Sequence, residues 1–229
     1  YIRFVVPEKQ SGHVVFKLDN VSKSYGDNLV IRKFSCEIHK GDKVALIGNN
    51  GRGKTTLLKL LAGELLPDSG KITYGHQVDI GYFPQNHADV IDKHTDRTAF
   101  DWLKERKEIV FDQDARGVLG KMLFSGDDAF KSLKALSGGE TARLLLGGLL
   151  LTAPNVLLLD EPNNHLDLEA VSALAWGLED YKGTALIATH DRGLMNEFAK
   201  KIIAFEADGI HYFEGPLEEY LQKKQAKSK

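Results

Sequence analysis

One glycine-rich run constrains the fold of this chain more than any other feature. Residues 48–56 read GNNGRGKTT, between a short apolar segment at 43–47 and a leucine-rich segment at 54–66. Spaced glycines followed by Lys and Thr form a phosphate-loop pattern, in which backbone N–H groups turn towards phosphate oxygens. The positive end of the following helix points at the same place. We therefore expect a strand, a phosphate-binding loop and a helix within an α/β core.

The side chains of this loop are expected to bind different parts of a nucleotide. Lys54 can reach the β and γ phosphates, and the Thr55 hydroxyl suits Mg²⁺, which keeps several waters and takes few protein oxygens. The alternative is a chance glycine loop, and the strand before it and the helix after it argue against that. The predicted ATP-binding residues of the loop are Gly48, Asn49, Asn50, Gly51, Arg52, Gly53, Lys54, Thr55 and Thr56.

A second motif places two carboxylates at the end of an apolar strand. Residues 156–162 read VLLLDEP, so Asp160 and Glu161 follow four apolar residues. Asp160 would hold Mg²⁺ through its water shell, and Glu161 would orient or deprotonate the attacking water. Alone, such a pair fits a solvated strand-to-loop junction equally well. The phosphate loop makes the catalytic interpretation the stronger one.

A third motif, LSGGE at 136–140, opens a strongly apolar helix. At its plainest it is a capping box, with Ser137 as the N-cap residue and Glu140 three positions on. Two glycines in a first helical turn cost about 1 kcal/mol each relative to alanine. They are explained if the start of this helix approaches a ligand closely, and a γ-phosphate suits a helix N-terminus.

Together these motifs resemble the ATP-binding cassette (ABC) family, whose signature is the LSGGE run between the phosphate loop and the paired carboxylates. The resemblance covers residues 14–213 and implies ATP hydrolysis with ATP and Mg²⁺ bound. It implies that a second cassette closes over the nucleotide. The residues expected to contact the ATP of that partner domain are Ser137, Gly138, Gly139 and Glu140.

Further positions take their expected roles from this resemblance alone. Gln85 stands where the family has a glutamine that senses Mg²⁺ and the γ-phosphate, and we count it with Thr55 and Asp160 as a metal residue. His190 matches the family's switch histidine and is expected to be catalytic together with Glu161. Other matches are Tyr25, which would stack on adenine, and residues 164–167, which would cross to the partner domain.

A narrower resemblance is to the ABC-F branch, whose members are translation-associated and carry two cassettes in one chain. Residues 160–167 (DEPNNHLD), 189–192 (THDR) and 213–221 resemble the corresponding ABC-F motifs, and 1–4 resemble the end of the linker between the two cassettes. Asn163 departs from the threonine of the family, and Arg52 replaces a residue that is often small. This resemblance implies a C-terminal cassette, a cytoplasmic location and ribosome or RNA contacts made through the parent protein.

Two other functions share the same chemistry. The chain could be the ATP-binding subunit of an ABC membrane transporter, docking near Gln85. It could also belong to a DNA-repair or chromosome-maintenance ATPase, but those carry long coiled coils, and the sequence shows none. A formal net charge of −2 argues against strong nucleic-acid binding by the cassette itself, although the lysines at 223–229 could touch RNA phosphates.

The expected architecture is α/β: a P-loop NTPase core with a mixed, mainly parallel sheet and flanking helices, an antiparallel β subdomain and an inserted helical subdomain at about 86–148. We expect residues 1–13 to end an interdomain linker and 14–229 to form the ATPase domain. The first residue is Tyr1, which suggests a piece of a longer protein. A single cysteine, Cys36, allows no internal disulfide and favours a reducing compartment. No apolar run reaches the roughly 18 residues of a membrane span.

Overall fold

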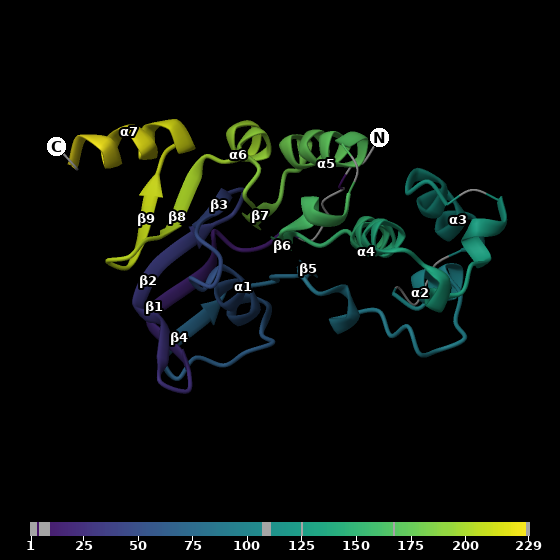
Figure 1. Ribbon diagram of the computed structural model, residues 1–229, viewed down its shortest axis with the longest axis horizontal. Coiled ribbons are helices and arrows are strands. Elements are labelled where there is room, and N and C mark those ends of the chain that lie inside the picture. Colours follow the sequence, from purple (N-terminus) through teal and green to yellow (C-terminus); the bar gives the residue numbers. More distant parts are fainter. Residues whose placement is uncertain (1–3, 5–9, 107–110, 125, 167, 228–229) are drawn as a thin grey trace.

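The computed structural model describes residues 4, 10–106, 111–124, 126–166 and 168–227 (Figure 1). A six-stranded sheet crosses the middle of the molecule in the order β5-β6-β7-β3-β8-β9. Its pairs are parallel except that of β8 with β9. The strands are β3 (Lys43–Gly48), β5 (Ile80–Phe83), β6 (Val156–Asp160), β7 (Thr184–Ala188), β8 (Lys201–Phe205) and β9 (Ile210–Glu214).

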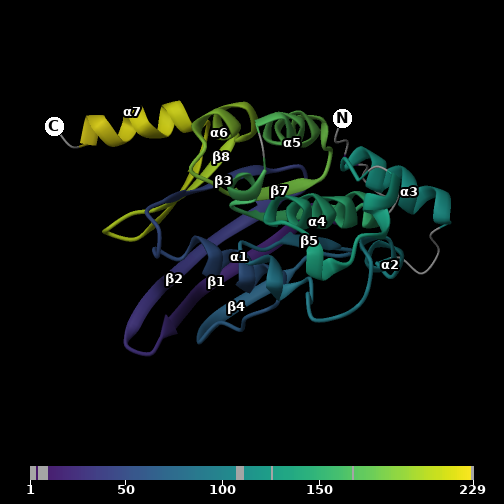
Figure 2. The same ribbon diagram turned by 45° about the vertical axis from the view of Figure 1, so that its right-hand side comes forward.

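A second, antiparallel sheet of three strands covers one face of the central sheet. It consists of β2 (Asn28–His39), β1 (Val14–Tyr25) and β4 (Ser69–Tyr74), in that order. Helix α1 (Lys54–Ala62) lies between the two sheets (Figures 1 and 2). Its buried leucines share one apolar core with inward-facing residues of β1, β2, β3, β6, β7 and β8. The expected parallel core and antiparallel β subdomain are both confirmed.

Helices cover the opposite face of the central sheet. These are α4 (Gly138–Thr152), α5 (Leu168–Asp180), α6 (Arg192–Phe198) and α7 (Leu217–Lys227), and they form a second apolar core with alternate residues of the same strands. Both faces of β6 and β7 are therefore buried, which explains why each reads as a continuous apolar run. Among the described residues, no helix is both long and apolar enough to cross a membrane.

A helical part projects beyond β5 and packs on α4 (Figure 2). It contains α2 (Ala99–Lys104), α3 (Asp112–Lys121) and the 3₁₀ turns η1 (His87–Asp89), η2 (Gly126–Phe130) and η3 (Leu133–Ala135). Two glycines of α4 permit this contact, because a Cβ at Gly148 would lie 3.1 Å from the ring of Trp102 and one at Gly147 would lie 3.2 Å from Val118 and Met122. A helical part between β5 and β6 was expected. The limits of the helical subdomain (86–148), of the linker end (1–13) and of the ATPase domain (14–229) stay predictions. Residues 1–3 and 5–9 lie outside the described part.

The sequence pattern predicts a first strand over 14–18, helices over 54–66 and 98–111, and a last helix from Tyr220, and the structure moves each of these limits. The first strand was expected to end at Leu18 but continues to Tyr25, because its later residues pair with β2 as far as Asn28. Helix α1 was expected to reach Leu66 but ends at Ala62, where Gly63 takes a left-handed conformation with φ 78°. The helix expected over 98–111 is shorter and ends at Lys104, and residues 107–110 lie outside the described part. The last helix begins at Leu217, not at Tyr220.

Candidate nucleotide site

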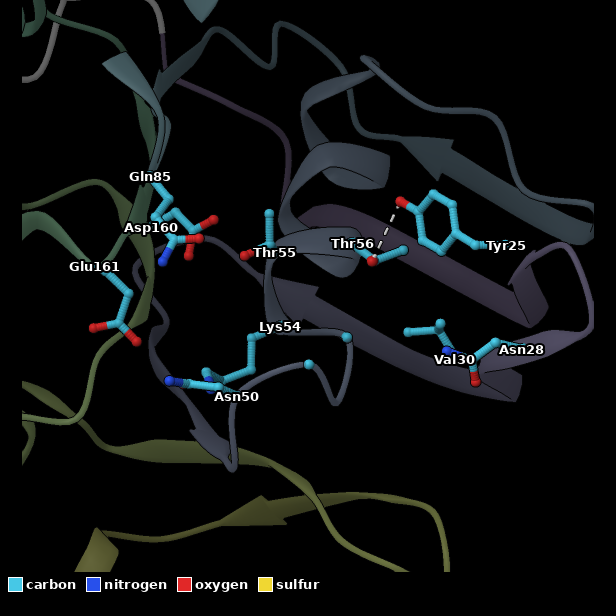
Figure 3. A pocket seen from close by; sticks show the side chains of 12 residues that line it. Tyr25, Asn28, Val30, Asn50, Lys54, Thr55, Thr56, Gln85, Asp160 and Glu161 are labelled. Carbon is cyan, nitrogen blue, oxygen red and sulfur yellow. Dashed lines mark hydrogen bonds between the residues drawn. The ribbon is translucent and has the colours of Figure 1, made fainter. Parts of the chain in front are cut away.

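Four loops meet at the carboxyl-terminal edge of the central sheet. Gly48 ends β3 and Asp160 ends β6, while Gln85 follows β5 and His190 follows β7 within two residues. Because β5, β6, β7 and β3 are neighbours in the sheet, their following loops converge. The loops after β3, β5 and β6 border a cavity of about 340 Å³ (Figure 3). Its lining is Tyr25, Asn28, Val30, Asn50, Gly51, Gly53, Lys54, Thr55, Thr56, Gln85, Asp160 and Glu161.

The phosphate loop curls around the side chain of Lys54. Gly48, Gly51 and Gly53 all have positive φ, at 138°, 76° and 110°, so this loop needs glycine where the sequence supplies it. Lys54 is 6% exposed, and its Nζ donates a hydrogen bond of 2.7 Å to the carbonyl of Gly48. Burial lowers the pKa of Lys54, while the carboxylates of Glu161 and Asp160 oppose that shift. Gly48, Asn49 and Arg52, three of the predicted ATP-binding residues, do not line the cavity.

The paired carboxylates face the phosphate loop from the end of β6 (Figure 3). Asp160 and Glu161 are 1% and 5% exposed. Among the described residues, neither carboxylate oxygen of Asp160 accepts a hydrogen bond of good geometry, although the Thr55 hydroxyl lies close enough to act on it, and Oε2 of Glu161 accepts none. Burial raises the pKa of both carboxyls. The Thr55 hydroxyl and then Lys54 oppose that shift at Asp160, and His190 and then Lys54 oppose it at Glu161. Buried carboxylate oxygens with so few protein partners are suited to bind a cation through its hydration shell.

His190 stands between the carboxylates and the phosphate loop. Its Nε2 lies 2.7 Å from Oδ1 of Asn50, 3.3 Å from Oε1 of Glu161 and 3.5 Å from Nζ of Lys54. The ring is half exposed, and His190 is not among the residues that line the cavity. The structure thus brings His190 to Glu161, and Gln85 lines the same cavity as Asp160.

The antiparallel sheet supplies the other wall of the cavity. Tyr25 is 51% exposed there, and its hydroxyl accepts a hydrogen bond of 3.4 Å from Thr56. Asn28 and Val30 line the same wall and were missed from the sequence. Val30 also packs against the phosphate loop, since a Cβ at Gly53 would lie 2.6 Å from its Cγ1. The sequence could have indicated Asn28 and Val30 only through the turn after Tyr25, because that turn brings the following strand back beside Tyr25.

The signature residues stand apart from this cavity. None of Ser137, Gly138, Gly139 or Glu140 lines it. Ser137 caps α4 in a complete capping box: its hydroxyl accepts from the Glu140 N–H, and the Glu140 carboxylate accepts from the Ser137 N–H at 2.7 Å. Lys131 lies 2.7 Å from Glu140 and, with the Ser137 N–H, lowers the pKa of that carboxyl to about 2. Residues 164–167 follow the carboxylates, but Asp167 lies outside the described residues, and the His165 side chain is likewise not described.

A phosphate loop, a buried lysine and two unpaired carboxylates at one sheet edge define a nucleotide-hydrolysing P-loop protein. Comparison with known proteins specifies the family. Residues 31–164 match the family described as ABC transporter, so the chain belongs to that family and is an ABC ATPase domain that binds ATP.

Two similar curated proteins are both called ATP-binding protein Uup. This chain is 39% identical to that of Escherichia coli K12 over 228 residues, which is 94% of this chain and 35% of the relative. It is 43% identical to that of Haemophilus influenzae over 204 residues, which is 87% of this chain and 31% of the relative. Both relatives carry the name of ATP-binding proteins, in keeping with a nucleotide-binding cassette. The chain spans less than half the length of the curated relatives it matches.

Solved structures confirm the fold. The dimeric structure of MJ0796, a bacterial ABC transporter cassette, superposes with a TM-score of 0.74 at 21% identity, covering 87% of this chain and 98% of that one. A second dimeric structure of MJ0796, bound to ADP and Pi in a post-hydrolysis state, superposes with a TM-score of 0.71. At this level of identity the likeness supports the ABC cassette architecture alone.

Proposed function

We propose that this cassette hydrolyses ATP with Mg²⁺ in the cavity of Figure 3, using Glu161 as the base. One observation supports this assignment above the others: the unpaired oxygens of Asp160 and Glu161 face the buried ammonium of Lys54 across one cavity. Backbone N–H groups of the loop and Lys54 would bind the β and γ phosphates. Raised pKa values of the two carboxyls suit a cation site and a base that takes a proton.

The residues present fit Mg²⁺. Thr55, Gln85 and Asp160 would hold the ion, which when bound neutralises charge on the phosphate oxygens. The described residues contain no group of three or more His, Cys, Asp or Glu side chains able to hold a metal. Mg²⁺ needs no such group, because it keeps several waters and also binds substrate phosphates. Glu161 would orient and deprotonate the water, and His190 would support the γ-phosphate side of the cavity.

We further infer that the signature residues act on a nucleotide held by a second cassette. Ser137, Gly138, Gly139 and Glu140 lie outside the cavity, yet the capping box leaves the first turn of α4 preorganised. Support comes from the two MJ0796 structures, both dimeric cassettes. ATP would join the two cassettes, and loss of the γ-phosphate would release them. The second cassette is either in the same parent chain or a second copy of this one.

The parent protein is proposed to be a cytoplasmic, ribosome-associated ABC-F factor. The motifs at 160–167 and 189–192 and the relation to Uup support this assignment. With a net charge of −2, the cassette itself would make few RNA contacts, with at most a minor share from the lysines at 223–229. The alternative, an ATP-binding subunit of a membrane transporter, shares the family and the reaction.

A trapped variant separates the two assignments. In Glu161→Gln the amide keeps the shape of the side chain but takes no proton, so ATP should bind and persist. The full-length protein, with the matching glutamate of its second cassette also changed, is sedimented with ribosomes in ATP and in ADP. ATP-dependent co-sedimentation that weakens as salt rises supports the ribosomal assignment. If the trapped protein stays in the supernatant and instead co-purifies with an integral membrane protein, the transporter alternative is supported. Wild-type turnover in Glu161→Gln would refute Glu161 as the base.

A further inference from the structure

A hydrogen bond joins the two loops that carry Glu161 and His190. The hydroxyl of Thr189 donates to Oδ1 of Asn163 over 2.7 Å. Thr189 immediately precedes His190, and Asn163 follows Glu161 by two positions. The bond therefore links the loop after β6 to the loop after β7 directly beside both proposed catalytic groups. Neither Asn163 nor Thr189 lines the nucleotide cavity.

The surrounding backbone fixes both partners of this bond. Asn163 lies in the 3₁₀ turn η4 (Pro162–His165), and Thr189 is 2% exposed at the end of β7. The Glu161 N–H donates to the carbonyl of Ala188 at 2.8 Å, which sets the spacing of the two loops at their bases. The Thr189 hydroxyl also accepts from the Asp191 N–H at 3.1 Å. Its single proton is thus directed at Asn163.

His190 and Glu161 contact each other beside this bond. Nε2 of His190 lies 3.3 Å from Oε1 of Glu161, a contact between side chains from the two linked loops. Glu161 itself has a left-handed backbone, with φ 48°, which is unfavourable for a non-glycine residue and must be held by its surroundings. A bond from Asn163 to Thr189 opposes rotation of either loop away from the other.

We propose that Asn163 is a positioning residue for ATP hydrolysis, acting through Thr189 to hold His190 against Glu161. Asparagine suits this position, because its Oδ1 only accepts and so takes the single proton of the Thr189 hydroxyl. The proposal rests on the proposed function, in which Glu161 is the base.

The test is a double-mutant cycle on steady-state ATP hydrolysis. Asn163→Ala removes the acceptor and Thr189→Val removes the donor while keeping the shape. Each should lower kcat about tenfold, the effect of losing one hydrogen bond to a buried hydroxyl, with KM for ATP changed less than twofold. The double variant should be no slower than either single variant, because both remove the same bond. Thr189→Ser keeps the hydroxyl and should recover most of the lost kcat.

Two controls make the outcome specific. Thr152→Val removes a hydroxyl that bonds within α4, remote from the cavity, and should leave kcat and KM unchanged. Glu161→Gln tests the proposed function separately, since its full activity would refute the base while leaving the cycle interpretable. The positioning role is overturned if the two single effects multiply, if KM rises while kcat holds, or if Thr189→Ser is as slow as Thr189→Val. Thermal unfolding of each variant identifies a misfolded one, and the serine-to-valine comparison at 189 then decides alone.

Discussion

Gly48→Ala should destabilise the fold, because the backbone of Gly48 has a positive φ and packs directly against β8. Gly48 is the last residue of β3 and pairs with Phe205 of β8 inside the central sheet. With φ at 138°, an added Cβ would stand 2.6 Å from the Phe205 carbonyl oxygen and 2.9 Å from its Cβ. Neither atom can move without disturbing the sheet. Left-handed strain costs about 1–3 kcal/mol and overpacking about 1–3 kcal/mol more.

The expected loss of unfolding free energy is therefore about 2–6 kcal/mol, which for a chain of this size lowers Tm by roughly 4–24 °C. Gly51→Ala is the matched control in the same loop. Its φ of 76° is also positive, but nothing lies within 4 Å of an added Cβ. It should cost only the left-handed conformation, about 1–2 kcal/mol. Gly117→Ala, in helix α3 and equally open, should be stabilising by about 0.5–1 kcal/mol.

Urea unfolding without nucleotide measures all three variants, because a bound ligand would raise apparent stability by mass action. We expect the highest urea midpoint for Gly117→Ala, a lower one for Gly51→Ala and the lowest for Gly48→Ala. If Gly48→Ala and Gly51→Ala unfold at the same urea concentration, contact with Phe205 is not what requires glycine at position 48.

Lys54→Ala should abolish ATP binding or nearly so, because backbone donors cannot replace a charge-assisted bond to phosphate; calorimetry measures the affinity, and unchanged binding would contradict the assignment. Ser137→Arg should leave the ATP affinity of the cassette nearly intact while blocking ATP-dependent pairing with a second cassette, which sedimentation measures. If Ser137→Arg loses as much ATP affinity as Lys54→Ala, the signature residues bind the nucleotide of their own cassette. The Glu140 carboxyl has its pKa lowered to about 2 by Lys131 and the Ser137 N–H. The stabilisation that this carboxylate gives to the fold is complete above pH 4.5 and is lost as pH falls towards 2. Lys131→Met should therefore weaken the fall of Tm with acid. An unchanged profile of Tm against pH would contradict this role of Lys131.

The sequence could predict what local chemistry dictates. Glycines with positive φ, an apolar strand ending in carboxylates and a capping box each depend on neighbours within a few residues, and each has the expected form in the structure. Gly48, Asp160 and His190 each follow a short apolar strand, which predicts that they meet at one edge of a parallel sheet, and the three strands β3, β6 and β7 are indeed adjacent. Parallel strands put the ends that carry polar residues on one side whatever the loops between them do.

Contacts between distant segments could not be predicted in this way. Val30 and Asn28 reach the cavity only because β2 passes in front of the phosphate loop, which the antiparallel pairing with β1 determines. The bond from Thr189 to Asn163 spans 26 residues and depends on β6 and β7 being neighbours. A polar residue at 163 was identified only as a departure from the family, because no local pattern indicates its partner.

The buried charged groups of the cavity lower the stability of the fold without a ligand and favour binding of a nucleotide with its cation. Asp160 and Glu161 are buried with three oxygens unpaired among the described residues, and burial raises the pKa of both carboxyls. The same burial lowers the pKa of Lys54. Each shift marks a charged form that the protein alone stabilises poorly. Phosphate oxygens would satisfy the ammonium and a hydrated cation the carboxylates, so nucleotide binding removes several penalties together. A site of this kind should hold its catalytic groups rigidly before substrate arrives, and a bond such as that between Asn163 and Thr189 supplies that rigidity.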